Sequence, residues 1–131
     1  MSPKVKLTKN QMLVFASLQA SKKPKTAYDL LDELRDRGIK APAQIYRALT
    51  HLVESHLIHR IDSINSYLPC KDTTNEHSNV TCFAICDNCK YVAELSETSI
   101  SKHINLVISQ TGFTSNFATI EVHGTCSVCK V

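Results

Sequence analysis

Tryptophan is absent from this sequence and glycine is scarce, with only Gly38, Gly112 and Gly124 among 131 residues. Three glycines so far apart cannot form a loop that cradles a phosphate group, so nucleotide hydrolysis is not expected. No apolar run approaches the roughly 20 residues that a membrane-spanning helix needs. The polar N-terminal segment also lacks the apolar centre of a secretory signal peptide. We therefore expect a cytoplasmic protein with no membrane partner.

Four of the six cysteines form two C-x-x-C pairs, Cys86 with Cys89 and Cys126 with Cys129. Two such pairs supply the four thiolates of a tetrahedral zinc site, and the long interval between them predicts that the metal ties together the two ends of a small folded unit. A disulfide framework would need an oxidising compartment, for which the sequence carries no signal. A redox-active pair is the other alternative, but two pairs without flanking proline or tryptophan favour a metal.

Charge is distributed unevenly along the chain. Residues 1–60 contain 11 Lys and Arg against 5 Asp and Glu, whereas residues 61–131 contain 4 against 7. The first half includes a predicted basic loop, Lys22-Lys23-Pro24-Lys25. A basic half favours a polyanionic partner, for which nucleic acid is the natural candidate, and a merely solvated basic surface is the alternative.

The basic half contains two predicted helices before residue 40. The first begins at a capping box formed by Thr8 and Gln11 and ends near Ser21, and the second begins at Thr26 and ends at Gly38. The apolar residues that recur at helical spacing are Met12, Phe15 and Leu18 in the first helix and Leu30, Leu31 and Leu34 in the second.

A third helix is predicted from Pro42, which suits a first helical turn. Its apolar stripe is Ile45, Leu49, Leu52 and Val53; the residues that point away are Gln44, Arg47, Thr50, His51 and Glu54, with Tyr46 at the boundary. Two short strands at 57–61 and 66–68 follow around a turn. Three helices and a hairpin predict a winged helix-turn-helix, whose third helix enters the major groove of DNA.

Several outward residues are candidate DNA contacts. An arginine such as Arg47 can clamp guanine O6 and N7, and the ring of Tyr46 can touch a thymine methyl group. Each also has an ordinary explanation as a solvated or edge-of-core side chain. The predicted DNA-binding residues are Gln44, Tyr46, Arg47, Thr50, His51, Lys22 and Lys23.

The second half of the chain predicts a small α+β unit. Strands are expected at 80–85, 91–95 and 117–123, with a helix before Gly112 whose apolar face is Ile100, Ile104, Val107 and Ile108. A unit of this size cannot bury enough apolar area alone. We therefore expect zinc and a second copy of the chain, in a homodimer, to complete its core.

The residues of ligand type outside the C-x-x-C pairs include His59, Cys70, His77 and Glu94. Each alone is explained without a metal, as a wing histidine near phosphate, a buried thiol, a loop histidine and a surface carboxylate. Their spacing along the chain does not bring them together.

Five segments resemble the ferric uptake regulator family, and within it the zinc-uptake branch. These segments are residues 26–31 (TAYDLL), 45–49 (IYRAL), 64–67 (INSY), 83–89 (FAICDNC) and 120–126 (IEVHGTC). The resemblance runs nearly from end to end. It implies a winged-helix domain at 1–69, a connector at 70–79 and a dimerisation domain at 80–131, with structural zinc on the four paired cysteines.

The resemblance also implies that His59, Cys70, His77 and Glu94 bind a second, regulatory zinc. Two imidazoles, one thiolate and one carboxylate form a set with a soft member, whereas iron(II) and manganese sensors favour nitrogen and oxygen donors. The sequence departs from the family pattern at Gln44, where many members have threonine, around His77 and at Cys82. Cys82 either packs as a small apolar residue or joins the ligands.

The prediction is thus a zinc-responsive repressor, not an enzyme, with two zinc ions per chain and no small-molecule substrate. As a homodimer it would bind an inverted-repeat operator and control zinc-uptake genes. A sensor of iron, manganese or peroxide in the same family, a zinc-stabilised DNA-binding protein without sensing, and a thiol oxidoreductase are the alternatives.

Overall fold

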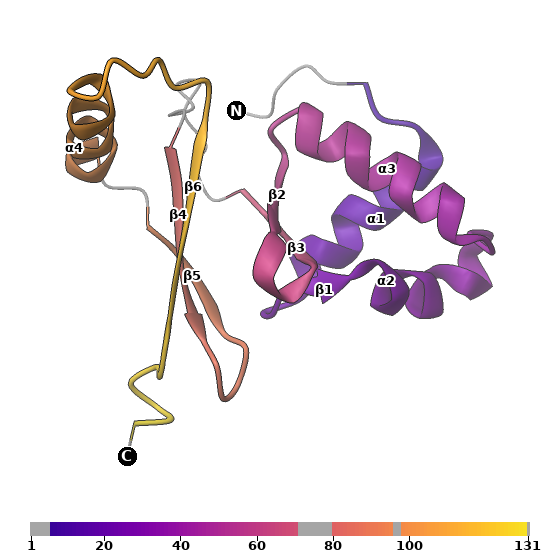
Figure 1. The fold of residues 1–131 in the computed structure, drawn as a ribbon. Helices are drawn as coiled ribbons and strands as arrows, with labels where there is room; N and C mark the ends of the chain where they lie inside the picture. Colours follow the sequence, from indigo (N-terminus) through magenta and orange to yellow (C-terminus); the bar gives the residue numbers. More distant parts are fainter. Residues whose placement is uncertain (1–5, 71–79, 96–97, 131) are drawn as a thin grey trace. The chain divides into compact units, whose positions relative to one another are not determined.

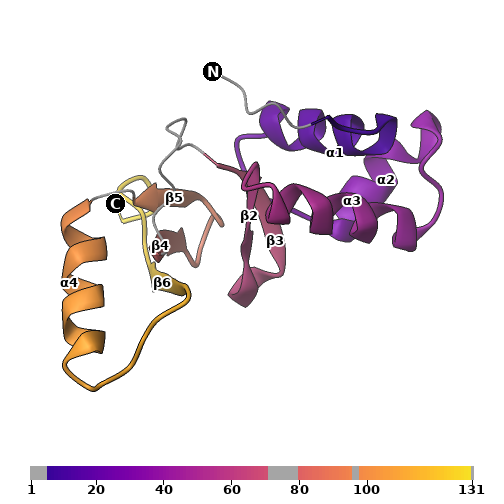
Figure 2. The same ribbon diagram turned by 90° about the horizontal axis from the view of Figure 1, so that it is seen from above.

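The structure, a computed structural model, describes residues 6–70, 80–95 and 98–130. The chain divides into two compact units, Met1–Thr73 and Thr74–Val131 (Figures 1 and 2). Residues 71–79 of the predicted connector lie outside the described residues, so its extent stays a prediction. No helix in the described parts of the chain is long and apolar enough to cross a membrane.

The N-terminal unit is a winged helix, as predicted. Its elements are α1 (Lys9–Ala20), β1 (Lys25–Thr26), α2 (Ala27–Leu34), the 3-10 turn η1 (Arg35–Arg37), α3 (Pro42–Glu54), β2 (Ile58–Ile61), η2 (Asp62–Ile64) and β3 (Ser66–Pro69). The three strands form an antiparallel sheet in the order β1-β3-β2. The predicted hairpin is therefore the wing, formed by β2 and β3.

Local signals explain where these helices begin and end. Thr8 and Gln11 form a reciprocal capping box at the start of α1, and Thr26 and Asp29 form another at the start of α2. Gly38 adopts φ +101°, a left-handed conformation that favours glycine, directly after η1. The three helices pack around one apolar core whose fully buried members include Val14, Leu18, Leu30, Ile39, Ile45, Leu49 and Leu52.

Two details of this unit differ from the sequence-based expectations. The side chain of Met12 is 53% exposed, and Val14, Ser17 and Leu18 are the buried residues of α1. Of the three predicted apolar residues, Leu18 is buried and Phe15 packs against the core, so only Met12 departs from the prediction. Lys25 was expected in a basic loop, yet it begins β1 and pairs with Tyr67 of β3.

The C-terminal unit consists of β4 (Val80–Cys86), β5 (Val92–Leu95), α4 (Thr98–Ser109) and β6 (Ala118–Gly124). The sheet order is β5-β4-β6, with β5 antiparallel and β6 parallel to β4. A parallel pair needs a crossover connection, and α4 lies within that connection, to one side of the sheet in both ribbon views (Figures 1 and 2). The predicted α+β class is confirmed.

The core of the C-terminal unit is small. Its buried apolar residues are Val80, Cys82, Phe83, Ile85, Cys86 and Val92, all on β4 or β5. In contrast, Val107 of α4 is 53% exposed although the sequence placed it on the apolar face. A second copy of the unit, as predicted from its size, would have apolar surface to cover.

Candidate metal centre and nucleic-acid interface

The parallel pairing of β4 and β6 brings the two C-x-x-C pairs together. In this register Cys86 at the end of β4 lies opposite Gly124 at the end of β6, and the Asp87 amide donates to the Gly124 carbonyl at 2.8 Å. Both pairs then form the same tight turn, in which the amide four residues after the first cysteine donates back to its carbonyl, at 2.9 Å from Lys90 and 3.0 Å from Lys130. Residues 40 positions apart thus meet at one end of the sheet.

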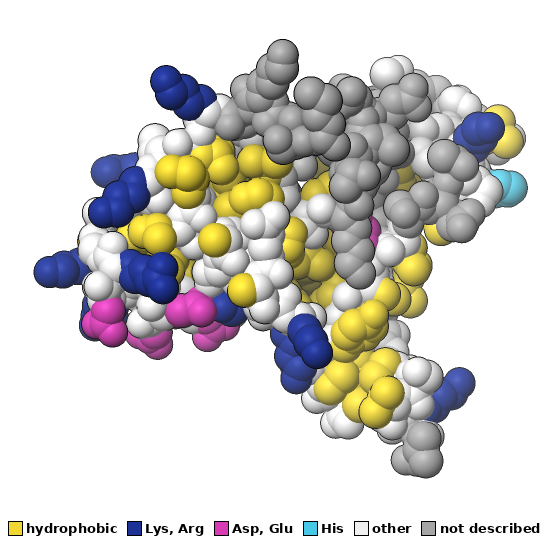
Figure 3. Space-filling model, turned by 180° about the vertical axis from the view of Figure 1, so that it is seen from behind, with side chains coloured by type: hydrophobic (Ala, Val, Ile, Leu, Met, Phe, Trp, Pro, Cys, Tyr) yellow, Lys and Arg dark blue, Asp and Glu magenta, His cyan; other side chains and the backbone are white. Residues whose placement is uncertain are grey.

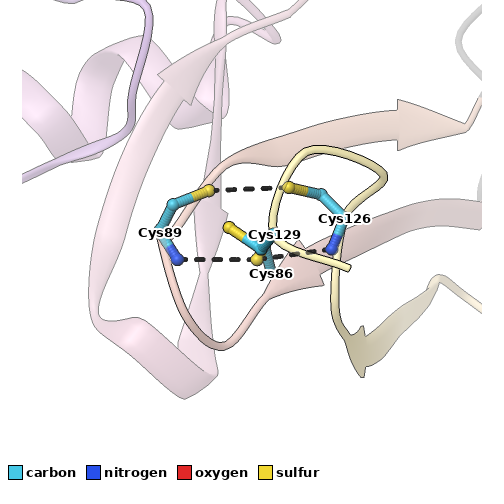
Figure 4. Close-up of side chains that lie close together, drawn as sticks. All are labelled: Cys86, Cys89, Cys126 and Cys129. Atoms are coloured by element: carbon cyan, nitrogen blue, oxygen red, sulfur yellow. Dashed lines mark hydrogen bonds between the residues drawn. The ribbon is translucent and has the colours of Figure 1, made fainter. Parts of the chain in front are cut away.

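The four sulfur atoms converge on one point (Figure 4). The Sγ atoms of Cys86, Cys89, Cys126 and Cys129 all lie within 4.8 Å of one another, and those of Cys89 and Cys126 are 3.8 Å apart. Such a group of four thiolate donors suits a tetrahedral zinc ion, which takes Cys₄ ligand sets. The sequence-based grouping of these cysteines therefore matches the geometry.

Backbone hydrogen bonds favour ionisation of two of these thiols, Cys86 and Cys126. The amides of Cys89 and Cys126 donate to the Cys86 Sγ atom at 3.5 and 3.4 Å, and they lower the pKa of Cys86 to about 6. The Cys129 amide lowers the pKa of Cys126 in the same way. A hydrogen bond from Asn88 lowers the pKa of Cys129, but the neighbouring Cys126 thiol opposes it and the value rises to about 11. Four adjacent thiolates thus need a cation to compensate their charge.

The second predicted ligand set is partly visible within the N-terminal unit. His59 lies on β2 and Cys70 follows β3, and the Cys70 amide donates to the Leu57 carbonyl at 2.9 Å. This pairing of the wing strands brings a ring nitrogen of His59 within 4.8 Å of the Cys70 Sγ atom. Glu94 is a half-buried residue of β5 in the other unit, and His77 lies outside the described residues. The complete set stays a prediction.

Cys82 is buried in β4, where its strand partners are Leu95 of β5 and Ile120 of β6. Burial raises the pKa of its thiol, which disfavours the thiolate that would bind a metal. Within the described residues it belongs to neither group of candidate ligands. The structure thus favours the packing role of Cys82 over the ligand role.

The predicted DNA-facing residues of α3 divide into two groups. Tyr46, Arg47 and Thr50 are exposed, as a contact with a ligand in solution requires. Gln44 is half-buried, and its Oε1 atom accepts hydrogen bonds from the Lys40 and Ala41 amides. His51 departs from the outward orientation predicted for it, because the residue is half-buried and its Nε2 atom is enclosed, with no hydrogen-bond partner among the described residues.

Lys22 and Lys23, the predicted contacts to the DNA backbone, are exposed in the turn between α1 and β1. Figure 3 shows Lys and Arg side chains, in dark blue, at several points on the surface of this unit. Lys25 is different, because its Nζ atom lies 2.6 Å from Glu33 Oε2 and 3.0 Å from Ser17 Oγ. Hydrogen bonds from Lys25 and Ser17 lower the pKa of Glu33. The positive charge of Lys25 is therefore engaged in an ion pair within the N-terminal unit.

The sequence did not reveal that residues of α1 lie beside the predicted DNA-binding residues of α3. Asn10 and Gln11, at the start of α1, line one cavity with Gln44 and Arg47. Gln11 was recognised only as a helix cap. The one signal available was that both Gln11 and Gln44 are the third residue of a helix, which says nothing of their proximity.

Together these features define a metal-binding, winged-helix protein. Residues 2–123 match the profile of the Ferric uptake regulator family. The chain belongs to the ferric uptake regulator family.

Several proteins similar to this chain are zinc uptake regulators. The chain is 32% identical over 126 residues to the Zinc uptake regulation protein of Escherichia coli (strain K12), covering 95% of this chain and 73% of the relative. A solved zinc uptake regulator complexed with zinc and DNA superposes with a TM-score of 0.88 at 31% identity, covering 96% of this chain and 84% of that chain. The crystal structure of holo XcZur gives a TM-score of 0.86 at 30% identity, covering 98% and 89%.

Proposed function

We propose that this protein is a zinc-responsive transcriptional repressor, which binds an inverted-repeat operator as a zinc-loaded homodimer and controls zinc-uptake genes in the cytoplasm. The observation that carries the proposal is the 32% identity, over 95% of the chain, to a protein named for zinc uptake regulation. The likeness to a regulator solved with zinc and DNA supports the same function. The protein would be a regulator and not an enzyme.

Each chain would bind two zinc ions. One would be structural, on Cys86, Cys89, Cys126 and Cys129, because thiolate zinc sites contribute directly to folding. The other would be regulatory, on His59, Cys70, His77 and Glu94. The proximity of the His59 ring to the Cys70 sulfur supports this second site. Cys70 also favours zinc over iron(II) or manganese, because thiolate is the softest donor of the set.

The proposed response to zinc depends on which unit supplies each ligand. His59 and Cys70 belong to the N-terminal unit and Glu94 to the C-terminal unit. A zinc ion bound by all of them would restrict the relative motion of the two units. Zinc would then shift the population toward the form that binds DNA, by no more than its difference in affinity for the two forms.

Exposed apolar residues of the C-terminal unit support the proposed homodimer. Leu106 and Val107 on α4, Val122 on β6 and Phe117 just before β6 are each more than half exposed. Apolar side chains, yellow in Figure 3, are also visible on this unit from behind. A second copy could bury these residues and enlarge a core that is small in one chain.

The deciding experiment measures metal content and operator binding together. Protein purified under reducing conditions is analysed for zinc per chain, and its affinity for DNA upstream of zinc-uptake genes is titrated against buffered free zinc. The proposal expects two zinc ions and binding that rises with zinc. Binding independent of zinc would indicate a non-sensing protein, and a stronger response to iron, manganese or peroxide would indicate another member of the family. Disulfide-exchange activity would indicate an oxidoreductase.

A further inference from the structure

A cavity of about 260 Å³ lies in the N-terminal unit, where the start of α1 meets the start of α3. Its lining residues are Thr8, Asn10, Gln11, Gln44, Arg47 and Ala48. All six lie in one compact unit, and none of them is acidic. Five of the six lining residues carry polar side chains, whose aliphatic parts form much of the cavity surface.

Two glutamines of this lining have their acceptor atoms already in use. The Thr8 amide donates to Gln11 Oε1 at 2.9 Å, and the Lys40 and Ala41 amides donate to Gln44 Oε1 at 2.9 and 3.1 Å. A backbone N–H can only donate, so the partner atom in each bond must be the side-chain oxygen and not the nitrogen. The group left over in both glutamines is the NH₂, which only donates.

The remaining polar groups fit the same kind of ligand. Asn10 can offer an NH₂ group, and Arg47 adds the single positive charge of the lining. A site with several hydrogen-bond donors and one guanidinium suits an acceptor-only group of charge −1. A phosphodiester of a nucleic-acid backbone has this charge, whereas free phosphate is more negative and would lack full compensation here.

We propose that this cavity binds one backbone phosphate of duplex DNA, held by the amide groups of Gln11 and Gln44. The proposal rests on the proposed function and assigns a specific contact to it. Phosphate contacts fix the orientation of a protein on the duplex, while contacts to base edges provide specificity. Gln44 would thus position α3, and Tyr46 and Thr50 would remain available for base edges. Gln11 becomes a DNA contact that lies outside α3.

Glutamate variants separate this role from helix capping. Gln11→Glu and Gln44→Glu keep the acceptor oxygens that cap α1 and α3, so the melting temperature should not fall. Both variants lose the donor group and place a negative charge where the phosphate would lie. Because hydrogen bonds to charged groups are among the stronger ones, each variant should bind DNA at least about tenfold more weakly. Gln19→Glu is the matched control, since Gln19 is an exposed residue of α1 that does not line the cavity.

Binding is measured on a random-sequence duplex and on the operator at low salt, so the result does not depend on whether zinc controls binding. Equal losses on both duplexes for the two cavity variants, with Gln19→Glu within about twofold of the parent, support the phosphate site. Parental affinity in the cavity variants, an equal loss in Gln19→Glu, or a loss confined to the operator would overturn it. Replacing the contacted phosphate by an uncharged methylphosphonate should remove the difference between parent and variants. Zinc-independent binding by the parent would contradict only the proposed function.

Discussion

Replacing Cys70 with serine should impair zinc sensing while it leaves the fold intact. Cys70 is half-buried after β3, and its amide donates to the Leu57 carbonyl at 2.9 Å. Serine keeps this backbone hydrogen bond and is no larger than cysteine. Cys70 does not belong to the four-cysteine group, so the structural zinc should remain bound. What the substitution removes is the soft ligand of the proposed regulatory site.

The expected size of the effect follows from the population shift that sensing needs. Moving an equilibrium from 1:99 to 99:1 takes about 10⁴-fold tighter zinc binding to the DNA-competent form, or about 5.5 kcal/mol. Removing even a residue that supports a ligand costs about 10- to 100-fold in metal affinity, so removing Cys70 itself should cost at least about 100-fold, or about 2.7 kcal/mol. If this loss falls on the competent form, saturating zinc brings the variant only to about 1:1.

The assay is a zinc titration of operator binding for the parent, Cys70→Ser and Cys82→Ser, with zinc counted per chain. Cys70→Ser should hold one zinc ion fewer, respond at about 100-fold higher free zinc and reach a lower plateau. Cys82→Ser is the matched control, because Cys82 is a thiol buried in β4. Superimposable curves for the parent and Cys70→Ser would refute the sensing site, and a response lost only in Cys82→Ser would transfer the ligand role to that residue.

Further substitutions test the other parts of the protein. Cys89→Ser should release the structural zinc and prevent dimer formation, because thiolate zinc binding contributes directly to folding. Zinc analysis and analytical sedimentation measure the two effects. Arg47→Ala should lose on the order of 1–3 kcal/mol of operator affinity. A loss confined to the operator, with relaxed specificity at one base pair per half-site, would indicate a base contact, and an equal loss on random DNA would assign the guanidinium to the proposed phosphate site. Lys22→Ala should instead weaken binding to all sequences and reduce the salt dependence by about one ion. Glu33→Gln removes the ion pair with Lys25. The pKa of Glu33 is lowered from 4.5, so this pair stabilises the fold above about pH 4.5, and the contribution is lost as the pH falls through the folded-state pKa. Thermal unfolding of parent and variant should therefore differ by about 0.5 kcal/mol at pH 7 and converge in acid.

Much of the winged-helix unit could be predicted because its signals are local. The capping boxes at Thr8 and Thr26 and the left-handed Gly38 each depend on residues three or four positions apart. The strand β1 was missed because two residues, Lys25 and Thr26, are too few to show alternation. Its formation depends on hydrogen bonds to β3, which lies some 40 residues further along the chain.

The four paired cysteines could be grouped from the sequence, whereas His59 and Cys70 could not. The two C-x-x-C spacings were enough to group four cysteines, because that spacing is itself a ligand geometry. No spacing rule connects His59 with Cys70, and the resemblance to a family supplied that grouping. The cavity residues Gln11 and Gln44 could not be paired from the sequence, because only the packing of α1 against α3 makes them neighbours.

The parallel pairing of β4 with β6 also determines when the four-cysteine site can exist. Its two halves lie 40 residues apart, so the site is absent until that loop has closed, at an entropic cost of about 3 kcal/mol. An unfolded chain offers only isolated pairs of thiols, which hold zinc less tightly than four. Four-coordinate zinc binding therefore requires this loop to have closed, and a chain that loses the β4–β6 register also loses the four-cysteine site. Zinc occupancy of the four-cysteine site in a purified sample is thus a measure of how much of the C-terminal unit is correctly folded.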